Sequence, residues 1–403
     1  MLLSASQNVF SSSVKNSVSS AMKTSTLIAA LSATAVSAQF WESADQNPYL
    51  ERTQFVNPSY AAKLNQTIDA FLAKNDTLNA ARVRTVQKIS TFVWIDRVSN
   101  LSNIDNAITQ ARAVQESTGK EQIVQLVLYN VPDRDCSAGA SAGEFTNADD
   151  GLNKYKTLFV DPCAEKVKAA TDLTFAIILE PDSLGNVVTN MGAELCSQAA
   201  PGYEQGIAYA ISKLQARNIN LYIDAAHGGW LGWPDHLRRA SAEFRKVLSM
   251  AQNLTATAKI RGFATDVSNF NPYIASPRAN YTANSPSYDE LRYVESLAPL
   301  LTNLSLPAHF IIDQGRSGLQ NTRQTWGEWC NIEAGFGIRP TIQTNTTLVD
   351  SIVWAKPGGE SDGPCGYTGV GVQGTSAPNA GQWWDEYVQM LVKNASPPIE
   401  PSY

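Results

Sequence analysis

The stretch FAIILEPDSLGN at residues 175–186 decides the expected fold. Its apolar residues 175–179 run directly into Glu180, Pro181 and Asp182. A short, continuous apolar run is typical of a strand buried on both faces of a parallel sheet, and a proline then ends it. The carboxyl group of Asp182 is therefore expected just beyond the carboxyl end of a strand, where α/β enzymes place their active sites.

Similar apolar runs recur along the chain and alternate with segments of helical spacing. The expected strands are 89–95, 123–131, 173–179, 219–223, 260–265, 309–312 and 351–355, and the expected helices include 59–79, 103–117, 202–216 and 287–301. Asn57 and Pro58 suit the cap and the first turn of the first of these helices. The alternation predicts an α/β fold with a parallel sheet, and about seven strands in one chain favour a barrel.

Polar and aromatic side chains follow each expected strand. In chain order they are Trp94 and Asp96; Asp133 and Asp135; Glu180 and Asp182; Asp224 and His227; Asp266; Asp313 and Arg316; Lys356, Glu360 and Asp362. The carboxyl ends of barrel strands converge on one face of the molecule. Polar residues mark the ends of strands in any fold, but that does not account for a polar cluster after every strand. The pattern therefore predicts one shared active site.

Asp182 and Asp135 are the candidates for a pair of carboxyl groups that act on a neutral substrate. Inverting glycosidases hold two such groups about 6.5–9.5 Å apart, one as a general acid and one as the base that activates a water. The acid must stay protonated near the working pH, so burial or a like charge must raise its pKa. The alternative for these two aspartates is a helix N-cap or an ion pair with Arg134.

Several tryptophans fall where they can line a groove. Trp230 and Trp233, in HGGWLGWP, follow the strand that ends at Asp224, and Trp94, Trp326 and Trp329 lie beyond strand ends or in loops. Aromatic faces stack on the apolar faces of sugar rings, so these residues favour a glucan-binding groove. Trp354, Trp383 and Trp384 stand in apolar patterns and are expected in the core.

The composition narrows the classes of function. The 403-residue chain has a net charge of −6 and no run of lysine or arginine, which argues against nucleic-acid or anionic membrane partners. It has no CxxC pair and no HExxH motif among its three histidines, and no phosphate-binding glycine loop or GxSxG elbow. We therefore expect a monomeric enzyme that uses no metal and no cofactor.

The start of the chain resembles a secretory leader. Lys23 precedes the small, apolar run 26–36, which ends in Ser37-Ala38 like a signal peptidase site, and Met22 is an alternative start. Asn-x-Ser/Thr sequons stand at Asn65, Asn75, Asn100, Asn253, Asn280, Asn303, Asn345 and Asn394. We expect a leader at 1–38 and one catalytic domain at 39–403, secreted, without a linker or a tethered carbohydrate-binding module. Five cysteines in an oxidising compartment then predict two disulfides and one leftover thiol.

The sequence resembles glycoside hydrolase family 6, the cellobiohydrolases and endoglucanases that cleave β-1,4-glucan with inversion. The matching segments are FVWID (92–96), YNVPDRDCSAGASAGE (129–144), LEPDSLGNVVTN (179–190), YIDAAHGGWLGWP (222–234), DQGRSG (313–318), WGEWCN (326–331), GFGIRP (335–340) and WAKPGGESDG (354–363). They cover nearly all of the expected mature chain in order. The family fold is a distorted barrel of about seven parallel strands.

The resemblance implies a role for each site residue. Asp182 would be the general acid, and Asp135 would raise its pKa and take a proton from the nucleophilic water through a second water. Ser141 and Tyr129 would position the water and the distorted sugar, and Asp362 is the alternative base. The residues that would line the subsites for β-1,4-glucan or cello-oligosaccharides are Trp94, Asp96, Asp224, His227, Trp230, Trp233, Asn269, Arg316, Trp329, Lys356 and Glu360.

The family's two disulfides map onto Cys136–Cys196 and Cys330–Cys365, which leaves Cys163 as a buried, inert thiol. Cys365 follows Asp362 by only three residues, where the tunnel-forming relatives carry a much longer insertion. Pro272-Tyr273 also replaces the Gly-Trp expected after Asn271 in the cellobiohydrolases.

Both departures favour an endo-acting enzyme. Residues 137–143 are not shortened, so a cellobiohydrolase stays the alternative. A non-catalytic glucan-binding protein is the third hypothesis, which loss of Asp182 or Asp135 would have favoured.

Overall fold

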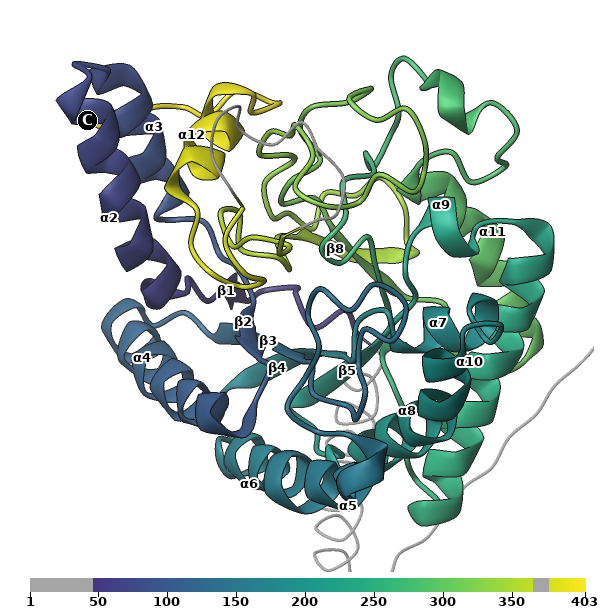
Figure 1. Ribbon diagram of the computed structural model, residues 1–403. Coiled ribbons are helices and arrows are strands. Elements are labelled where there is room, and N and C mark those ends of the chain that lie inside the picture. Colours follow the sequence, from purple (N-terminus) through teal and green to yellow (C-terminus); the bar gives the residue numbers. More distant parts are fainter. Residues whose placement is uncertain (1–45, 365–376) are drawn as a thin grey trace, which may run out of the picture. The chain divides into compact units, whose positions relative to one another are not determined.

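Parallel strands form one sheet at the centre of the fold (Figure 1). The computed structural model describes residues 46–364 and 377–403. Within them the strands are β1 (Thr53–Gln54), β2 (Val93–Ile95), β3 (Gln122–Leu128), β4 (Thr174–Leu179), β5 (Ile219–Asp224), β6 (Gly262–Thr265), β7 (Phe310–Asp313) and β8 (Val349–Val353). The leader expected at 1–38 lies outside the described residues.

The sheet has the order β1-β3-β4-β5-β6-β7-β8, and β2 also pairs with β3. β1 lies beside the start of β3 and β2 beside its end, so these two short strands share one position in the sheet. The opposite edge of the sheet, formed by β8, curls back toward this position. There the backbone N–H of Phe92, just before β2, donates to the carbonyl of Trp354, just after β8, at 3.1 Å. The expected distorted α/β barrel of about seven parallel strands is confirmed.

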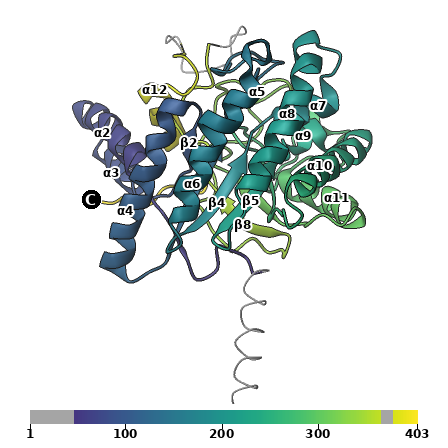
Figure 2. The same cartoon turned by 90° about the horizontal axis from the view of Figure 1, so that it is seen from below.

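Helices cover the outside of the curled sheet, and Figure 2 shows α4, α6, α8, α10 and α11 side by side around it. The longer helices are α2 (Pro58–Ala73), α3 (Thr77–Val86), α4 (Ser102–Thr118), α6 (Asp161–Ala169), α7 (Ser183–Thr189), α8 (Glu194–Lys213), α10 (Pro234–Leu254), α11 (Glu290–Asn303) and α12 (Asp385–Lys393). Short helical segments are η1 (Val98–Leu101), η2 (Asn147–Asp149), α5 (Gly151–Lys154), η3 (Tyr155–Val160), α9 (Gly228–Leu231) and η4 (Asn280–Thr282). No helix of the described segments is both long and apolar enough to cross a membrane.

The stretch that opened the sequence analysis is buried on both faces, as expected. Alternate β4 residues belong to different parts of the core, because successive side chains of a strand point to opposite faces. Phe175, Ile177 and Leu179 pack in the large cluster between sheet and helices. Ala176 and Ile178 pack inside the barrel in a second cluster. This two-sided burial fixes the strand, and with it the position of the residues that follow.

Several expected boundaries were wrong. The helix expected at 59–79 is two helices, because Asn75 takes a left-handed conformation (φ 58°) and Asp76 then caps α3 by accepting from the Asn79 N–H. The Asn57 cap before Pro58 is confirmed. The strand expected at 89–95 begins only at Val93, because β1 occupies the place beside the start of β3 and leaves residues 89–92 without a ladder partner there. β8 similarly ends at Val353 rather than at residue 355.

The cysteines follow the implied pattern as far as the described residues reach. Cys136 and Cys196 form a disulfide. Cys330 is also disulfide-bonded, but Cys365 lies outside the described residues, so that pairing stays a prediction. Cys163 is a buried free thiol, and burial raises its pKa to about 12. A thiol that stays protonated is a poor nucleophile, in agreement with the inert role expected for it.

Candidate active site

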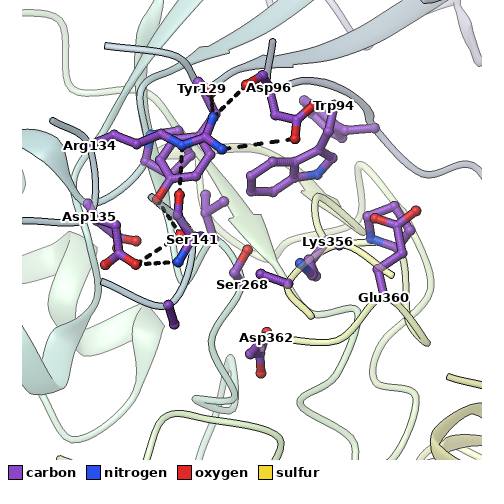
Figure 3. A pocket seen from close by; sticks show the side chains of 18 of the residues that line it. Trp94, Asp96, Tyr129, Arg134, Asp135, Ser141, Ser268, Lys356, Glu360 and Asp362 are labelled. Carbon is purple, nitrogen blue, oxygen red and sulfur yellow. Dashed lines mark hydrogen bonds and ion pairs between the residues drawn. The ribbon is translucent and has the colours of Figure 1, made fainter. Parts of the chain in front are cut away.

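A cleft of about 1170 Å³ opens at the carboxyl ends of the strands (Figure 3). Most of the predicted site residues line it: Trp94, Asp96, Tyr129, Asp135, Ser141, Asp182, His227, Trp230, Asn269, Trp329, Lys356, Glu360 and Asp362. Asp224, Trp233 and Arg316 are not part of this lining. The strand ends therefore converge on one cleft as expected, but three of the residues proposed to contact the substrate lie outside its lining.

Asp182 sits at the first position before α7, yet its side chain does not cap that helix. Its backbone is in the left-handed region (φ 66°), which is unusual for a residue with a Cβ and is often found at functional sites. The Asp182 N–H donates to Oδ2 of Asp224 at 2.9 Å, which holds this turn in place. The alternative role of Asp182 as a helix cap is wrong, and its carboxyl group faces the cleft instead.

The surroundings of Asp182 favour its protonated form. Burial raises its pKa well above the usual value, and the charges of Asp224, Asp135 and Asp362 raise it further, while Lys356 opposes them. Desolvation and nearby like charges both disfavour a carboxylate. Asp182 can therefore carry a proton at a pH where an ordinary aspartate would have lost it.

Asp135 is held beside a short chain of hydroxyl groups. Its Oδ2 accepts from the Ser141 backbone N–H at 2.7 Å and from Ser141 Oγ at 3.0 Å. Ser141 Oγ in turn lies 2.9 Å from the Tyr129 hydroxyl. Burial raises the Tyr129 pKa well above its usual value, so this phenol remains a neutral donor. The Asp135 carboxylate is thus fixed in orientation at the wall of the cleft.

Arg134 does not pair with Asp135, so that alternative is wrong as well. Its guanidinium stacks over the Tyr129 ring at 4.3 Å and donates to the carbonyls of Ser141 and Asp96 at 2.8 and 2.7 Å. The arginine therefore links the segment that carries Asp135 to Asp96, the residue after β2, and Figure 3 shows its contacts to Asp96 and Ser141.

Two of the residues outside the lining support the floor of the cleft. Asp224 is 3% exposed and accepts from the N–H groups of Asp182 and Ala226; burial raises its pKa to about 7. Arg316 is 1% exposed and pairs through one nitrogen with both oxygens of Asp362, at 2.8 and 2.9 Å. Trp233 lies to the side, where its Nε1 donates to the carbonyl of Gly229.

Aromatic residues contribute to the cleft lining at two places. Trp94 is fixed by a 2.8 Å hydrogen bond from its Nε1 to the carbonyl of Ala355, and the Lys356 ammonium lies 5.3 Å from its ring centre. At the second place Trp230 and Trp326 flank His227, with ring centres 6.2 and 6.3 Å from the imidazole. Burial lowers the His227 pKa to about 3, so this imidazole is neutral.

Some lining residues had no assigned role in the sequence analysis. They are Arg134, Ser268, several amides near α2 and α4, and most of the loop 137–142, whereas Trp326 lines the cleft as expected of a groove tryptophan. Ala140 of the loop 137–142 also comes close to Gly363. A Cβ added to Gly363 would lie 3.4 Å from the carbonyl oxygen of Ala140.

Glycosylation is expected to avoid two of the eight sequons. Asn100 lies in the cleft lining, and its Nδ2 donates to Asp96 Oδ1 at 2.5 Å, while Asn394 donates to the Ala334 carbonyl at 3.2 Å. A glycan on either nitrogen would break that bond, whereas the asparagines at 65, 75, 253, 280, 303 and 345 are exposed. Glycopeptide mass spectrometry of the folded, active protein should find both half-buried sites unmodified. Substantial occupancy of Asn100 would contradict this geometry.

Comparison with known proteins agrees with this geometry. The family model described as "Glycosyl hydrolases family 6" matches residues 49–395. A 1,4-β-D-glucan cellobiohydrolase, CEL6B, of Podospora anserina is 56% identical over 355 residues, which are 88% of this chain and 83% of that protein. The structure of the endoglucanase CEL6B from Humicola insolens has a TM-score of 0.82 at 50% identity and covers 87% of this chain and 99% of its own. The cellobiohydrolase II of Humicola insolens, solved in complex with glucose and cellotetraose, has a TM-score of 0.82 at 36% identity, covering 88% of this chain and 100% of its own.

Proposed function

This chain belongs to glycosyl hydrolase family 6, the inverting cellulases, and from that premise we propose that it cleaves internal β-1,4-glucosidic bonds with Asp182 as the general acid. The observation that carries the assignment is the Asp182 carboxyl group, which faces the cleft and has a pKa held up by burial and by three neighbouring carboxylates. A protonated acid beside the scissile oxygen is what a leaving sugar alkoxide requires.

Asp135 is the partner that we propose for the nucleophilic water. Its charge contributes to the raised pKa of Asp182, and its oriented carboxylate can accept a proton through water held by Ser141 and Tyr129. The neutral phenol of Tyr129 supports this role, because it can donate to the water or to the sugar without competing for the proton. One carboxyl group therefore gives a proton while the other receives one, as inversion requires.

Asp362 is a weaker candidate for the base. Both of its oxygens accept from the Arg316 guanidinium, and Oδ2 also accepts from the Asn331 N–H at 2.9 Å. These contacts engage both oxygens of Asp362, so fewer lone pairs remain to hold a nucleophilic water. We propose that Asp362 instead raises the pKa of Asp182 and positions Lys356 through its charge.

Replacing Asp135 with Ala should lower activity and shift its pH dependence. Activity requires protonated Asp182, so it falls as the pH rises through the Asp182 pKa. Removing one of the charges that raise this pKa moves the basic limb of the kcat/KM profile to lower pH. Loss of the proton acceptor should also lower kcat about a hundredfold. Profiles on cellopentaose would measure both effects.

The matched control is Asp149→Ala, because the Asp149 side chain is 80% exposed at the surface. It should keep the wild-type profile. A basic limb that stays in place, or moves to higher pH, in Asp135→Ala would rule out the proposed coupling of the two carboxyl groups.

Internal cleavage is supported by the chain around Asp362. Cys365 follows Asp362 by only three residues, so little chain is available between them to roof the cleft. A cellobiohydrolase mode is the second candidate, favoured by the approach of Ala140 to Gly363 across the cleft and by the similarity to named cellobiohydrolases. On carboxymethylcellulose, we expect viscosity to fall steeply for each reducing end formed. Cellobiose as the sole early product would contradict endo action.

The protein is also proposed to act outside the cell on cello-oligosaccharides or β-glucan. The small apolar run at 26–36, its Ser37-Ala38 ending and the eight sequons support secretion. We propose the same boundaries as before, a leader at 1–38 and a catalytic domain at 39–403. N-terminal sequencing of the secreted protein should begin at Gln39.

A further inference from the structure

We propose that the cleft has an outer sugar subsite beyond Trp94, formed by amide side chains of α4 and the start of α2, which binds a further part of a glucan chain. This inference rests on the proposed function, since it assigns the same substrate to an additional part of the same cleft. The cavity that holds Asp182 and Trp94 continues to Asn57, Asn103, Asn106 and Gln110. In Figure 1, α2 and α4 flank β1 and β2, which lie between them.

Three of these amides form a stripe on one side of α4. Asn103, Asn106 and Gln110 are spaced three and four residues apart, so they lie in a row on the helix surface. The row extends for about 10 Å at the helical rise of 1.5 Å per residue. That is comparable to the length of a cellobiose unit, so the stripe can follow a sugar chain instead of meeting it at a single point.

The amides of this stripe are available to a ligand. Within the described residues, the side chains of Asn103, Asn106 and Gln110 form no hydrogen bond to another protein group. Each carboxamide offers both a donor and an acceptor, which suits the hydroxyl groups of a neutral sugar. On the opposite wall Asn57 uses its Oδ1 to cap α2, which leaves its Nδ2 for a ligand.

The remaining walls also fit a neutral glucan. The Lys63 ammonium and the Glu360 carboxylate pair at 3.0 Å on the rim, so their charges largely cancel. Phe55, Phe92 and Trp94 all contribute to the lining of the same cleft. Aromatic and amide side chains without a net charge favour a carbohydrate over an anion or a peptide terminus. The outer subsite is thus continuous with the proposed catalytic cleft.

The test compares substrates of increasing length. For the wild type, kcat/KM should be higher for cellohexaose than for cellotetraose, because the longer chain also reaches the amides. The double variant Asn103→Ala/Asn106→Ala should lose about tenfold on cellohexaose, the effect of one or two net hydrogen bonds. It should lose less than about twofold on cellotetraose. Cleavage of end-labelled cellohexaose should also move to different bonds in the variant.

The control is Thr109→Ala, an exposed α4 residue outside the cleft lining. It should behave as wild type on both substrates, and equal melting temperatures would exclude a general defect in folding. An unchanged ratio of cellohexaose to cellotetraose in the double variant, or an equal loss on both, would overturn the outer subsite. A wild type that hydrolyses neither substrate would instead refute the proposed function on which it depends.

Discussion

Asp182→Asn is expected to lower kcat on cellohexaose about a thousandfold, with little change in KM. The amide cannot protonate the glycosidic oxygen, and the departing sugar alkoxide is a poor leaving group without a proton. The substitution keeps the size of the side chain and the backbone N–H that donates to Asp224. The burial and the negative neighbours that raise the pKa of Asp182 disfavour a charge at this position, so a neutral amide should not destabilise the fold.

Asp235→Asn is the matched control for this experiment. Its carboxylate is 66% exposed on α10, where it pairs with Arg238 and Arg239 at the surface. It should retain wild-type kcat on cellohexaose and a similar melting temperature. Retention of more than a tenth of wild-type kcat in Asp182→Asn would show that another group donates the proton.

Arg316→Met is expected to lower the free energy of unfolding by about 3–5 kcal/mol. The guanidinium is 1% exposed, stacks on Phe270 at 4.2 Å and pairs with the Asp362 carboxylate, whose side chain is 6% exposed. Methionine fills a similar volume but leaves that buried carboxylate without its cation. The loss should be measured by urea unfolding at pH 7, and it should diminish when Asp362→Asn is added, because the amide carries no charge.

Arg112→Met provides the comparison on the surface. Arg112 also pairs with an aspartate, Asp172, through two nitrogens at 2.8 and 2.7 Å, but the two side chains are 47% and 44% exposed. Water screens such a pair, so its loss should cost no more than about 1 kcal/mol. Equal losses in the two variants would mean that the Asp362–Arg316 pair is not the buried element described above.

The sequence predicts the sheet and the site through the same physical pattern. Strands such as 175–179 are buried on both faces, so their apolar runs stand out, and a proline or an acid marks the end of each. Since parallel strands end on one face, residues as distant as Trp94 and Lys356 could be assigned to one cleft without knowing any contact.

Other features depend on tertiary contacts that the linear pattern does not contain. β1 is two residues long and is defined by its pairing with β3 rather than by its own composition. A position at a strand end also does not show how deeply a side chain is buried. Asp224 and Arg316 stand at strand ends as Asp182 does, but they lie outside the cleft lining and support the residues that form it. The amides of α4 resembled any solvated helix face, and only their position beside the cavity gives them a possible role.

The substrate's leaving group provides the most direct test of Asp182 as the general acid. Asp182→Asn and wild type should be compared on cellohexaose and on a dinitrophenyl cellobioside, whose leaving group departs without protonation. We expect the variant to lose about a thousandfold on cellohexaose and less than about tenfold on the activated glycoside. Equal losses on both substrates would contradict the account, because the role of Asp182 would then not be to protonate the leaving oxygen.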